Sequence, residues 1–296
     1  MARMNSLFRM IDYCNLAALR TLVTRGPGQA RKILLAAERA AIPNEHIHVM
    51  SYWDIVRAFP VEGEITLQSS GWFDGATAPL ERLMMVQLLR AFQPRIIAEI
   101  GTYRGTTTRL LLDNCHPEAR IYTMDLPLGQ EAEALTAATD ERLIVHRKVG
   151  IDYLTHPRRS QVEQIYGDSF APDTWAKVPT GIEYAFIDAS HSYEAVKNDT
   201  EWIFQKMKPN AIVLWHDYSE GETAERGVGK YIRELMRTRD DIFLCSDTDL
   251  AIRIPCSELQ QCRNRVPGFF PNNDYPTRFP NGPTPWISAQ GDCKEA

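Results

Sequence analysis

Two short polar segments carry the side chains best suited to proton transfer or to metal binding. In the first, His191 follows Asp188 by three residues, and in the second, His216 directly precedes Asp217. A histidine with an ordinary pKa of about 6.5 can accept a proton from a hydroxyl at neutral pH. Two carboxylates together with water can hold a hard divalent cation. We therefore predict a reaction centre at these four residues, with His191 and Asp188 as its catalytic pair.

Two of these assignments have alternatives. His191 is the candidate general base, but a residue at this position could equally cap a helix that begins near Ser192. The candidate metal ligands are Asp188, His216 and Asp217, although histidine is a poor ligand for Mg²⁺ and suits Mn²⁺, iron or zinc better. The sequence leaves the need for a metal open, with Mg²⁺ and Mn²⁺ as the candidates.

A glycine-containing turn, Glu99-Ile-Gly101-Thr-Tyr103-Arg-Gly105, lies where an apolar run changes into a helical pattern. Glycines let a ligand approach the backbone there, and the helix that follows offers free N–H groups. A dinucleotide-binding turn would begin with glycine where this chain has Glu99. A pyrophosphate beside that carboxylate is unfavourable, so the turn favours a ligand with a cationic end and no phosphate.

Polar residues also end two further apolar runs. Asp125 ends one, and Asp168 with Ser169 ends the next. An acidic strand end can reflect exposure alone, and Gly-Asp-Ser is also ordinary turn chemistry. We assign these three residues to ligand binding, together with Glu99, Gly101, Tyr103 and Gly105, and Tyr103 could instead only fill its turn.

Alternating strands and helices must position these residues. The apolar runs predict strands at 95–100, 121–125, 162–166, 184–188, 211–215, 242–245 and 250–254, and the periodic segments predict helices at 30–40, 79–90, 106–114 and 196–207. Strands that end in polar loops are typical of a parallel sheet covered on both faces. The fold class is therefore α/β, with a doubly wound, mostly parallel sheet of seven strands. Ligands bind such sheets at the carboxyl ends of the strands.

Three regions follow from the composition along the chain. Residues 1–78 are predicted to be a mainly helical extension, 79–256 the α/β domain, and 257–296 an irregular arm rich in proline.

The formal charge is −5, which disfavours nucleic-acid or anionic-membrane partners. The six cysteines form no C-x-x-C pair, and no signal-peptide pattern is present at the start, so the chain is expected to be cytoplasmic.

Five segments in order resemble the class I S-adenosylmethionine-dependent methyltransferases. The glycine turn resembles the first motif of that superfamily. The segments Ile187-Asp-Ala-Ser-His191-Ser-Tyr193 and His216-Asp217 resemble a small-molecule group, related to catechol O-methyltransferases and to sugar and macrolide O-methyltransferases, with I-D-x-x-H-x-Y and a later H-D. The resemblance covers about residues 79–254 and implies a Rossmann-like fold.

The resemblance also implies roles for single residues. Asp125 would contact the ribose hydroxyls, Asp168 and Ser169 the adenine, and Tyr103 the methionine portion of the cofactor. His191 stands where metal-dependent relatives have a catalytic lysine, whereas His216 stands where they have an acidic ligand.

The expected activity is methyl transfer from S-adenosylmethionine to a small-molecule acceptor, most simply a hydroxyl of a sugar or natural product. The sequence does not distinguish an oxygen acceptor from a nitrogen acceptor. A homo-oligomer is possible, and the oligomeric state is left open. The alternatives are an NAD-dependent oxidoreductase and a non-catalytic interaction module of the same fold.

Overall fold

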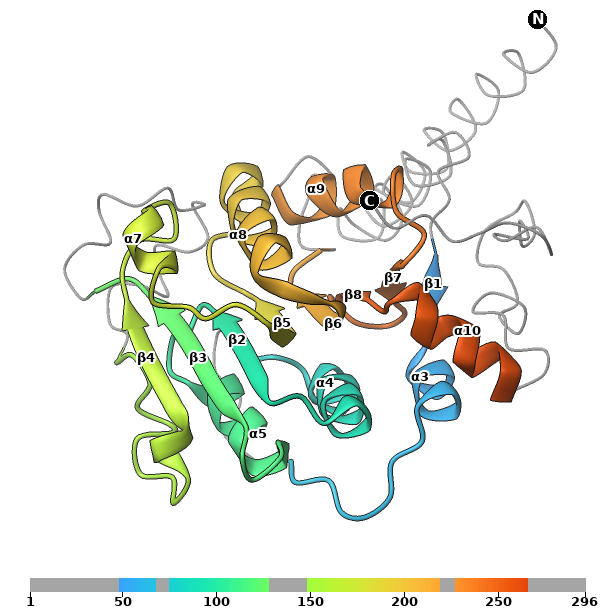
Figure 1. The fold of residues 1–296 in the computed structure, drawn as a ribbon, viewed down its shortest axis with the longest axis horizontal. Helices are drawn as coiled ribbons and strands as arrows, with labels where there is room; N and C mark the ends of the chain where they lie inside the picture. Colours follow the sequence, from blue (N-terminus) through green and yellow to red (C-terminus); the bar gives the residue numbers. More distant parts are fainter. Residues whose placement is uncertain (1–47, 68–74, 128–147, 219–226, 266–296) are drawn as a thin grey trace, which may run out of the picture. The chain divides into compact units, whose positions relative to one another are not determined.

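The computed structural model describes residues 48–67, 75–127, 148–218 and 227–265. Within these ranges one sheet runs through the fold, and helices pack on both of its faces (Figure 1). The helix predicted at 30–40 and residues 266–296 of the predicted arm lie outside the described residues.

The sheet has eight strands in the order β1-β7-β8-β6-β5-β2-β3-β4. Their bounds are β1 (Val49–Met50), β2 (Ile96–Ile100), β3 (Arg120–Asp125), β4 (Val162–Tyr166), β5 (Ile182–Ile187), β6 (Met207–Trp215), β7 (Ile242–Cys245) and β8 (Ala251–Arg253). Strand β8 pairs antiparallel with β6 and β7, and the other pairings are parallel. The predicted mostly parallel α/β sheet is confirmed.

The sheet has one strand more than the seven predicted. Strand β1 comes from the predicted helical extension and pairs with β7 at the edge of the sheet. Because it is two residues long, it has no run of alternating or apolar residues that a sequence pattern could detect. The described part of the extension therefore contains both a strand and a helix.

Helices cover both faces of the sheet. Helices α8 (Tyr193–Lys206) and α9 (Gly227–Met236) lie on one face, and α4 (Pro79–Phe92) and α5 (Thr106–Asn114) lie on the other (Figure 1). The remaining elements are α3 (Tyr52–Ala58), α7 (Pro172–Trp175), α10 (Cys256–Arg265) and the 3₁₀ turn Arg159–Gln161. The helices predicted at 79–90, 106–114 and 196–207 are thus confirmed within a few residues.

Helix α10 corrects the expectation that the chain is irregular beyond Pro255. Residues Cys256–Arg265 are helical. The prolines that suggested an irregular arm begin only at Pro267, and Pro255 precedes the helix, where it breaks no hydrogen bond of that helix.

The chain reverses its direction of travel across the sheet between β2 and β5. From β2 it moves outward through β3 and β4, and it then returns to the other side of β2 to form β5 and β6. In register, Ile100 at the end of β2 pairs with Ile187 at the end of β5, which pairs with Trp215 at the end of β6. The loops that follow these strands therefore emerge together, at the position where open α/β sheets bind ligands.

The core of this sheet is formed by large side chains without exposed surface, among them Trp175, Tyr184, Phe186 and Trp215.

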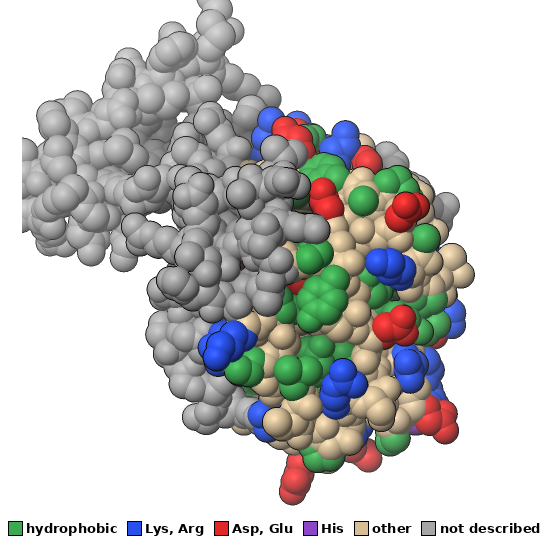
Figure 2. All heavy atoms as spheres, turned by 90° about the vertical axis from the view of Figure 1, so that its left-hand side faces the viewer, with side chains coloured by type: hydrophobic (Ala, Val, Ile, Leu, Met, Phe, Trp, Pro, Cys, Tyr) green, Lys and Arg blue, Asp and Glu red, His purple; other side chains and the backbone are tan. Residues whose placement is uncertain are grey.

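The face that carries β4 and α7 shows hydrophobic side chains interspersed with basic and acidic ones. Its described part has no continuous basic stripe (Figure 2). None of the helices in the described ranges is long and apolar enough to cross a bilayer.

Candidate active site

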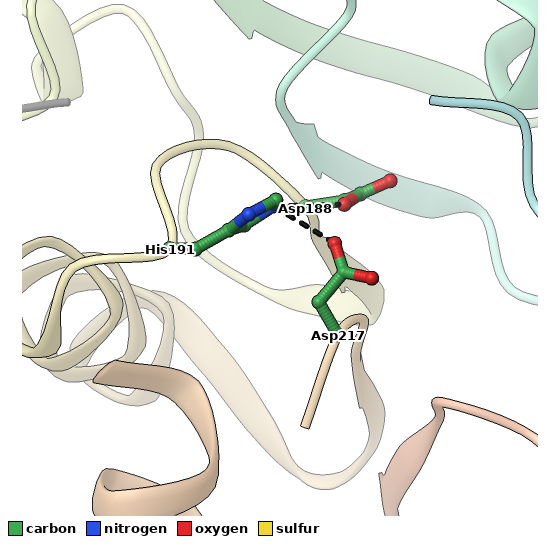
Figure 3. Close-up of side chains that lie close together, drawn as sticks. All are labelled: Asp188, His191 and Asp217. Atoms are coloured by element: carbon green, nitrogen blue, oxygen red, sulfur yellow. Dashed lines mark ion pairs between the residues drawn. The ribbon is translucent and has the colours of Figure 1, made fainter. Parts of the chain in front are cut away.

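Asp188, His191 and Asp217 converge at the carboxyl edge of the sheet (Figure 3). Nε2 of His191 lies 2.8 Å from Oδ2 of Asp217 and 3.9 Å from Oδ1 of Asp188. One ligand atom from each residue lies within 4.8 Å of the others. These side chains are 10–19% exposed, so the cluster is largely screened from solvent but still reachable.

The strands and the helix that follows them set this geometry. Asp188 directly follows β5, and its backbone N–H donates to the carbonyl of Ile100 at the end of β2. Helix α8 is capped by Ser192, whose hydroxyl accepts from the N–H of Ala195. The alternative in which His191 caps this helix is therefore wrong, and the imidazole points toward Asp217 instead (Figure 3).

Helix α9 packs tightly against the His191 loop. A Cβ at Gly227 would lie 1.9 Å from the carbonyl oxygen of His191 and 2.3 Å from the carbonyl carbon of Ser192. Glycine at the start of α9 therefore allows the helix to approach the loop that carries His191.

His216 lies behind the cluster, among three carboxylates. Its Nε2 is 3.0 Å from Glu81 Oε2, and its Nδ1 is 3.0 Å from Asp217 Oδ1 and 3.4 Å from Asp188 Oδ1. Burial by itself lowers the pKa of the ring, but the Asp188 charge and the bonds to the three carboxylates outweigh it. The pKa of His216 therefore lies well above its ordinary value.

Asp217 is shared between the two histidines, one at each carboxylate oxygen. Burial raises the pKa of its carboxyl, but the bonds to His191 and His216 outweigh that effect and hold the pKa well below its ordinary value. Its φ of +59° is a conformation that few residues other than glycine adopt. Asp217 is thus an ionised group held at a strained position.

The convergent group differs from the predicted metal ligands. The set expected from the sequence was Asp188, His216 and Asp217, whereas the group whose ligand atoms meet contains His191 in place of His216. Both histidines face the two aspartates, His216 through Nδ1 and His191 through Nε2, but His216 also turns its Nε2 toward Glu81.

The glycine turn joins β2 to α5 beside this cluster. Gly101 has φ +102°, and a Cβ there would lie 2.0 Å from the carbonyl oxygen of Asp188. Gly105, at φ +77°, is the N-cap of α5. Tyr103, at φ +46°, donates its backbone N–H to Asp125 Oδ2 over 2.7 Å. The turn is therefore packed directly against the β5 loop and tied to the end of β3.

Glu99 lies beneath the turn with no exposed surface. Its Oε2 accepts hydrogen bonds from the hydroxyls of Thr108 and Thr123, both over 2.5 Å. Burial raises the pKa of this carboxyl to about 8, in spite of the two hydroxyl donors. Glu99 therefore links β2 to β3 and α5 below the backbone that forms the turn.

Asp168 and Ser169 form the loop after β4. Asp168 Oδ1 accepts from the N–H of Phe170 over 2.9 Å, which is the turn chemistry that the sequence left open. The carbonyl of Ser169 accepts from Trp175 Nε1 and from Asn198 Nδ2. The loop is thus fixed by α7 and α8.

The sequence did not reveal Glu81, a buried residue in the first turn of α4. Its position resembles that of any acidic residue at a helix N-terminus, and it lies 135 residues from His216. Only the fold shows that these two side chains meet.

The sheet with its reversal between β2 and β5 defines a Rossmann-like fold. Residues 98–218 of this chain match the family model described as a methyltransferase domain. The predicted class of enzyme is confirmed.

Several solved structures of low sequence identity are similar to part of this chain. The O-methyltransferase TomG from Streptomyces achromogenes, in complex with S-adenosylmethionine, is 19% identical over 62% of this chain and 82% of its own, with a TM-score of 0.42. An O-methyltransferase from Bacillus cereus is 15% identical over 62% and 84%, with a TM-score of 0.43. One described as putative, from Klebsiella pneumoniae, is 16% identical over 74% and 94%, with a TM-score of 0.41. No curated protein sequence matches the chain.

Proposed function

We propose that the protein transfers the methyl group of S-adenosylmethionine to a hydroxyl oxygen of a small-molecule acceptor, of the sugar or natural-product class. The observation that supports this most directly is the closeness of the glycine turn to the Asp188 cluster: Gly101 packs on the carbonyl of Asp188 itself. A methyl donor bound at the turn would lie next to groups that can take a proton from a hydroxyl. In this reaction the S–CH₃ bond breaks, an O–CH₃ bond forms, and the hydroxyl proton leaves.

The cofactor would bind along the ends of β2, β3 and β4. We assign Gly101, Tyr103 and Gly105 to the methionine portion and Asp125 to the ribose hydroxyls. Asp125 accepts backbone N–H groups at both oxygens, and an ionised carboxylate has further lone pairs for two hydroxyls. Asp168 and Ser169 would contact the adenine.

Glu99 takes a supporting role in this proposal. Because it has no exposed surface, its carboxyl holds the turn through Thr108 and Thr123 and does not contact the cofactor directly. The negative charges nearest the sulfonium would then be those of Asp125 and Asp188, which are partly exposed at the edge of the sheet.

His191 is our general base. When the His191 ring accepts the hydroxyl proton, the resulting imidazolium can keep donating from Nε2 to Asp217 Oδ2, which lies 2.8 Å away. The ionised Asp217 would stabilise that imidazolium, as a carboxylate does for a catalytic histidine. Positioning of the donor and acceptor would supply the larger part of the rate, since the sulfonium is already activated.

The same three residues fit a divalent cation. Asp188, His191 and Asp217 offer two carboxylate oxygens and one imidazole nitrogen from a partly buried edge, a donor set that suits Mn²⁺ better than Mg²⁺. A bound cation would lower the pKa of an acceptor hydroxyl and orient it. His191 cannot act as base and as ligand through Nε2 at once, so the two roles are separable by experiment.

Replacement of His191 by alanine tests the base. We expect kcat to fall by about 100-fold or more, the usual contribution of a general base. The Kd for S-adenosylhomocysteine should stay within about twofold, because His191 lies in the loop after β5, paired with Asp217, and is not among the residues that we assign to the cofactor. Methyl transfer from labelled S-adenosylmethionine to a panel of hydroxylated acceptors measures the rate, and calorimetry measures the Kd.

The matched control is His156→Ala. His156 forms an equally close pair with a carboxylate, 2.9 Å from Asp113, which lies in the last turn of α5 and outside the Asp188 cluster. Equal rates in the wild type and the His191 variant would remove His191 from the mechanism. Full activity after exhaustive chelation would remove the metal, whereas loss of activity that Mn²⁺ restores would make His191 a ligand.

A further inference from the structure

Glu81 connects three separate segments behind the active site. It lies in the first turn of α4 and is 3% exposed. Its Oε2 accepts the N–H of Ala78 over 2.5 Å and lies 3.0 Å from His216 Nε2, and its Oε1 accepts the N–H of Asp249 over 2.9 Å. A buried carboxylate is costly unless its oxygens are bonded, and here both oxygens are.

These contacts continue to the reaction centre. With Nε2 turned to Glu81, the other ring nitrogen of His216 lies 3.0 Å from Asp217 Oδ1. The second oxygen of Asp217 lies 2.8 Å from His191 Nε2. Glu81, His216, Asp217 and His191 therefore form one unbroken series of close polar contacts, from a helix outside the matched family segment to the candidate base.

The His216 ring needs an external partner to hold this orientation. The torsion that rotates an imidazole about its Cβ–Cγ bond is broad and roughly twofold, so packing alone defines it weakly. Phe186 makes an edge contact with the ring, at 6.2 Å between centroids. Glu81 is the group that distinguishes one ring nitrogen from the other, because the remaining carboxylates both face Nδ1.

The Asp249 contact adds a second constraint on the same loop. While Asp249 donates its N–H to Glu81, its carbonyl accepts the N–H of Tyr218, the residue after Asp217. The Glu81 carboxylate thus contacts the His216 side chain, which precedes Asp217. It also bonds to the Asp249 turn, which in turn bonds to the backbone of Tyr218 after Asp217. Asp217 itself has a positive φ, which surrounding contacts must maintain.

We propose that Glu81 is a positioning residue for methyl transfer: it fixes the His216 ring and the Asp249 turn, and through them it holds Asp217 against His191. Its effect on turnover rests on the proposed function, whereas its effect on the His216 ring does not. Glu81 does not touch the acceptor or the cofactor in this proposal. It acts only through His216 and the loop after β6.

The test compares Glu81→Ala and Glu81→Gln with a control on the same helix. Gln87 is equally buried, and its side chain donates to the carbonyl of Phe59, away from the cluster. Gln87→Ala therefore removes a buried hydrogen bond of α4 without reaching His216. We expect kcat to fall 10- to 100-fold in Glu81→Ala, the usual effect of removing a group that orients a site residue. Glu81→Gln should recover part of that loss, and Gln87→Ala should stay within about twofold of the wild type.

A readout that needs no turnover accompanies the kinetics. In protein labelled with ¹⁵N-histidine, the His216 ring, assigned with His216→Asn, should show an Nε2–H that exchanges slowly with water. That signal should shift and exchange faster in Glu81→Gln, and the Kd for S-adenosylhomocysteine should stay within about twofold. If Glu81→Ala does not fold, the kcat and the ring spectrum of Glu81→Gln test the proposal instead.

Two results would overturn the proposal. One is a His216 ring with unchanged shifts and exchange in the folded Glu81 variants, and the other is a loss of kcat no larger than that of Gln87→Ala. If the wild type transfers no methyl group to any acceptor, the proposed function fails, and the ring spectrum still decides whether Glu81 positions His216.

Discussion

At the scale of single residues, burial changes what the carboxyl groups of this site do. Glu99 is enclosed and has its pKa raised to about 8, while Asp217 is bonded to two histidines and keeps a pKa well below its ordinary value. Two carboxyl groups near the same sheet edge therefore differ in charge at neutral pH. Burial raises the pKa of both, but only at Asp217 do the bonding partners, His191 and His216, outweigh it.

Glu99 gives the stability a measurable pH dependence. Its folded pKa of about 8 lies above the ordinary 4.5, so the folded state binds the proton more tightly than the unfolded state does. The contribution of Glu99 to stability is therefore full below about pH 4.5 and is lost as the pH rises toward 8. Glutamine does not titrate, so Glu99→Gln should gain stability relative to the wild type across this range.

The expected gain between pH 5 and pH 8 is on the order of 3 kcal/mol, from 1.36 kcal/mol per pKa unit. Urea unfolding of both proteins at several pH values measures the free energy of unfolding. A difference between the two proteins that does not vary with pH would show that Glu99 is ionised in the folded state throughout.

At the scale of elements, the site is made by the packing of loops and helix ends against one another. The glycine turn presses on the backbone of Asp188, and the first turn of α9 presses on that of His191. Such close approach leaves no room for a side chain. The glycines are visible in the sequence, but Asp188 and His191, whose backbones they meet, are 87 and 36 residues away and become apparent only in the fold.

Gly227→Ala tests the α9 contact. A Cβ 1.9 Å from the His191 carbonyl must displace that loop, at a cost of about 1–3 kcal/mol in stability. We expect kcat to fall as well, because the displaced loop carries the candidate base. The Kd for S-adenosylhomocysteine should change little, since the glycine turn lies on the β2 side of the sheet.

The neighbouring Val228→Ala is the control. Val228 is buried in the same helical turn, and its truncation should cost a similar amount of stability by leaving a small cavity. It should leave kcat near the wild-type value. Equal kcat values for the two variants at similar stability would show that α9 supports the fold and does not position His191.

At the scale of the whole described fold, the sequence predicted the sheet better than the side-chain pairings. Apolar runs such as Ile96–Ile100 are buried on both faces, so their composition alone identifies them as strands. Strand β1 is too short for any periodicity, and α10 was obscured by prolines that begin only after it ends. A sequence pattern can indicate an element only where the residues of that element show a clear periodicity or composition. Strand β1 and helix α10 lack such a signal.

The same limit applies to the site. Parallel strands bring Asp188 and Asp217 to one edge, and their strand-end positions predicted that much. Which histidine faces which carboxylate depends on loop conformation, including the positive φ of Asp217, and on Glu81 from a helix distant in sequence. No spacing in the sequence encodes those contacts.

Binding of S-adenosylhomocysteine, measured by titration calorimetry with NAD as the comparison, tests the central claim most directly. We predict that S-adenosylhomocysteine binds and NAD does not, and that Asp125→Ala weakens the binding at least about tenfold by removing a charged partner of the ribose. Asp113→Asn, which alters a carboxylate paired with His156 away from the turn, should leave the affinity unchanged. Preferential binding of NAD, or an affinity for S-adenosylhomocysteine that is indifferent to Asp125, would contradict the account.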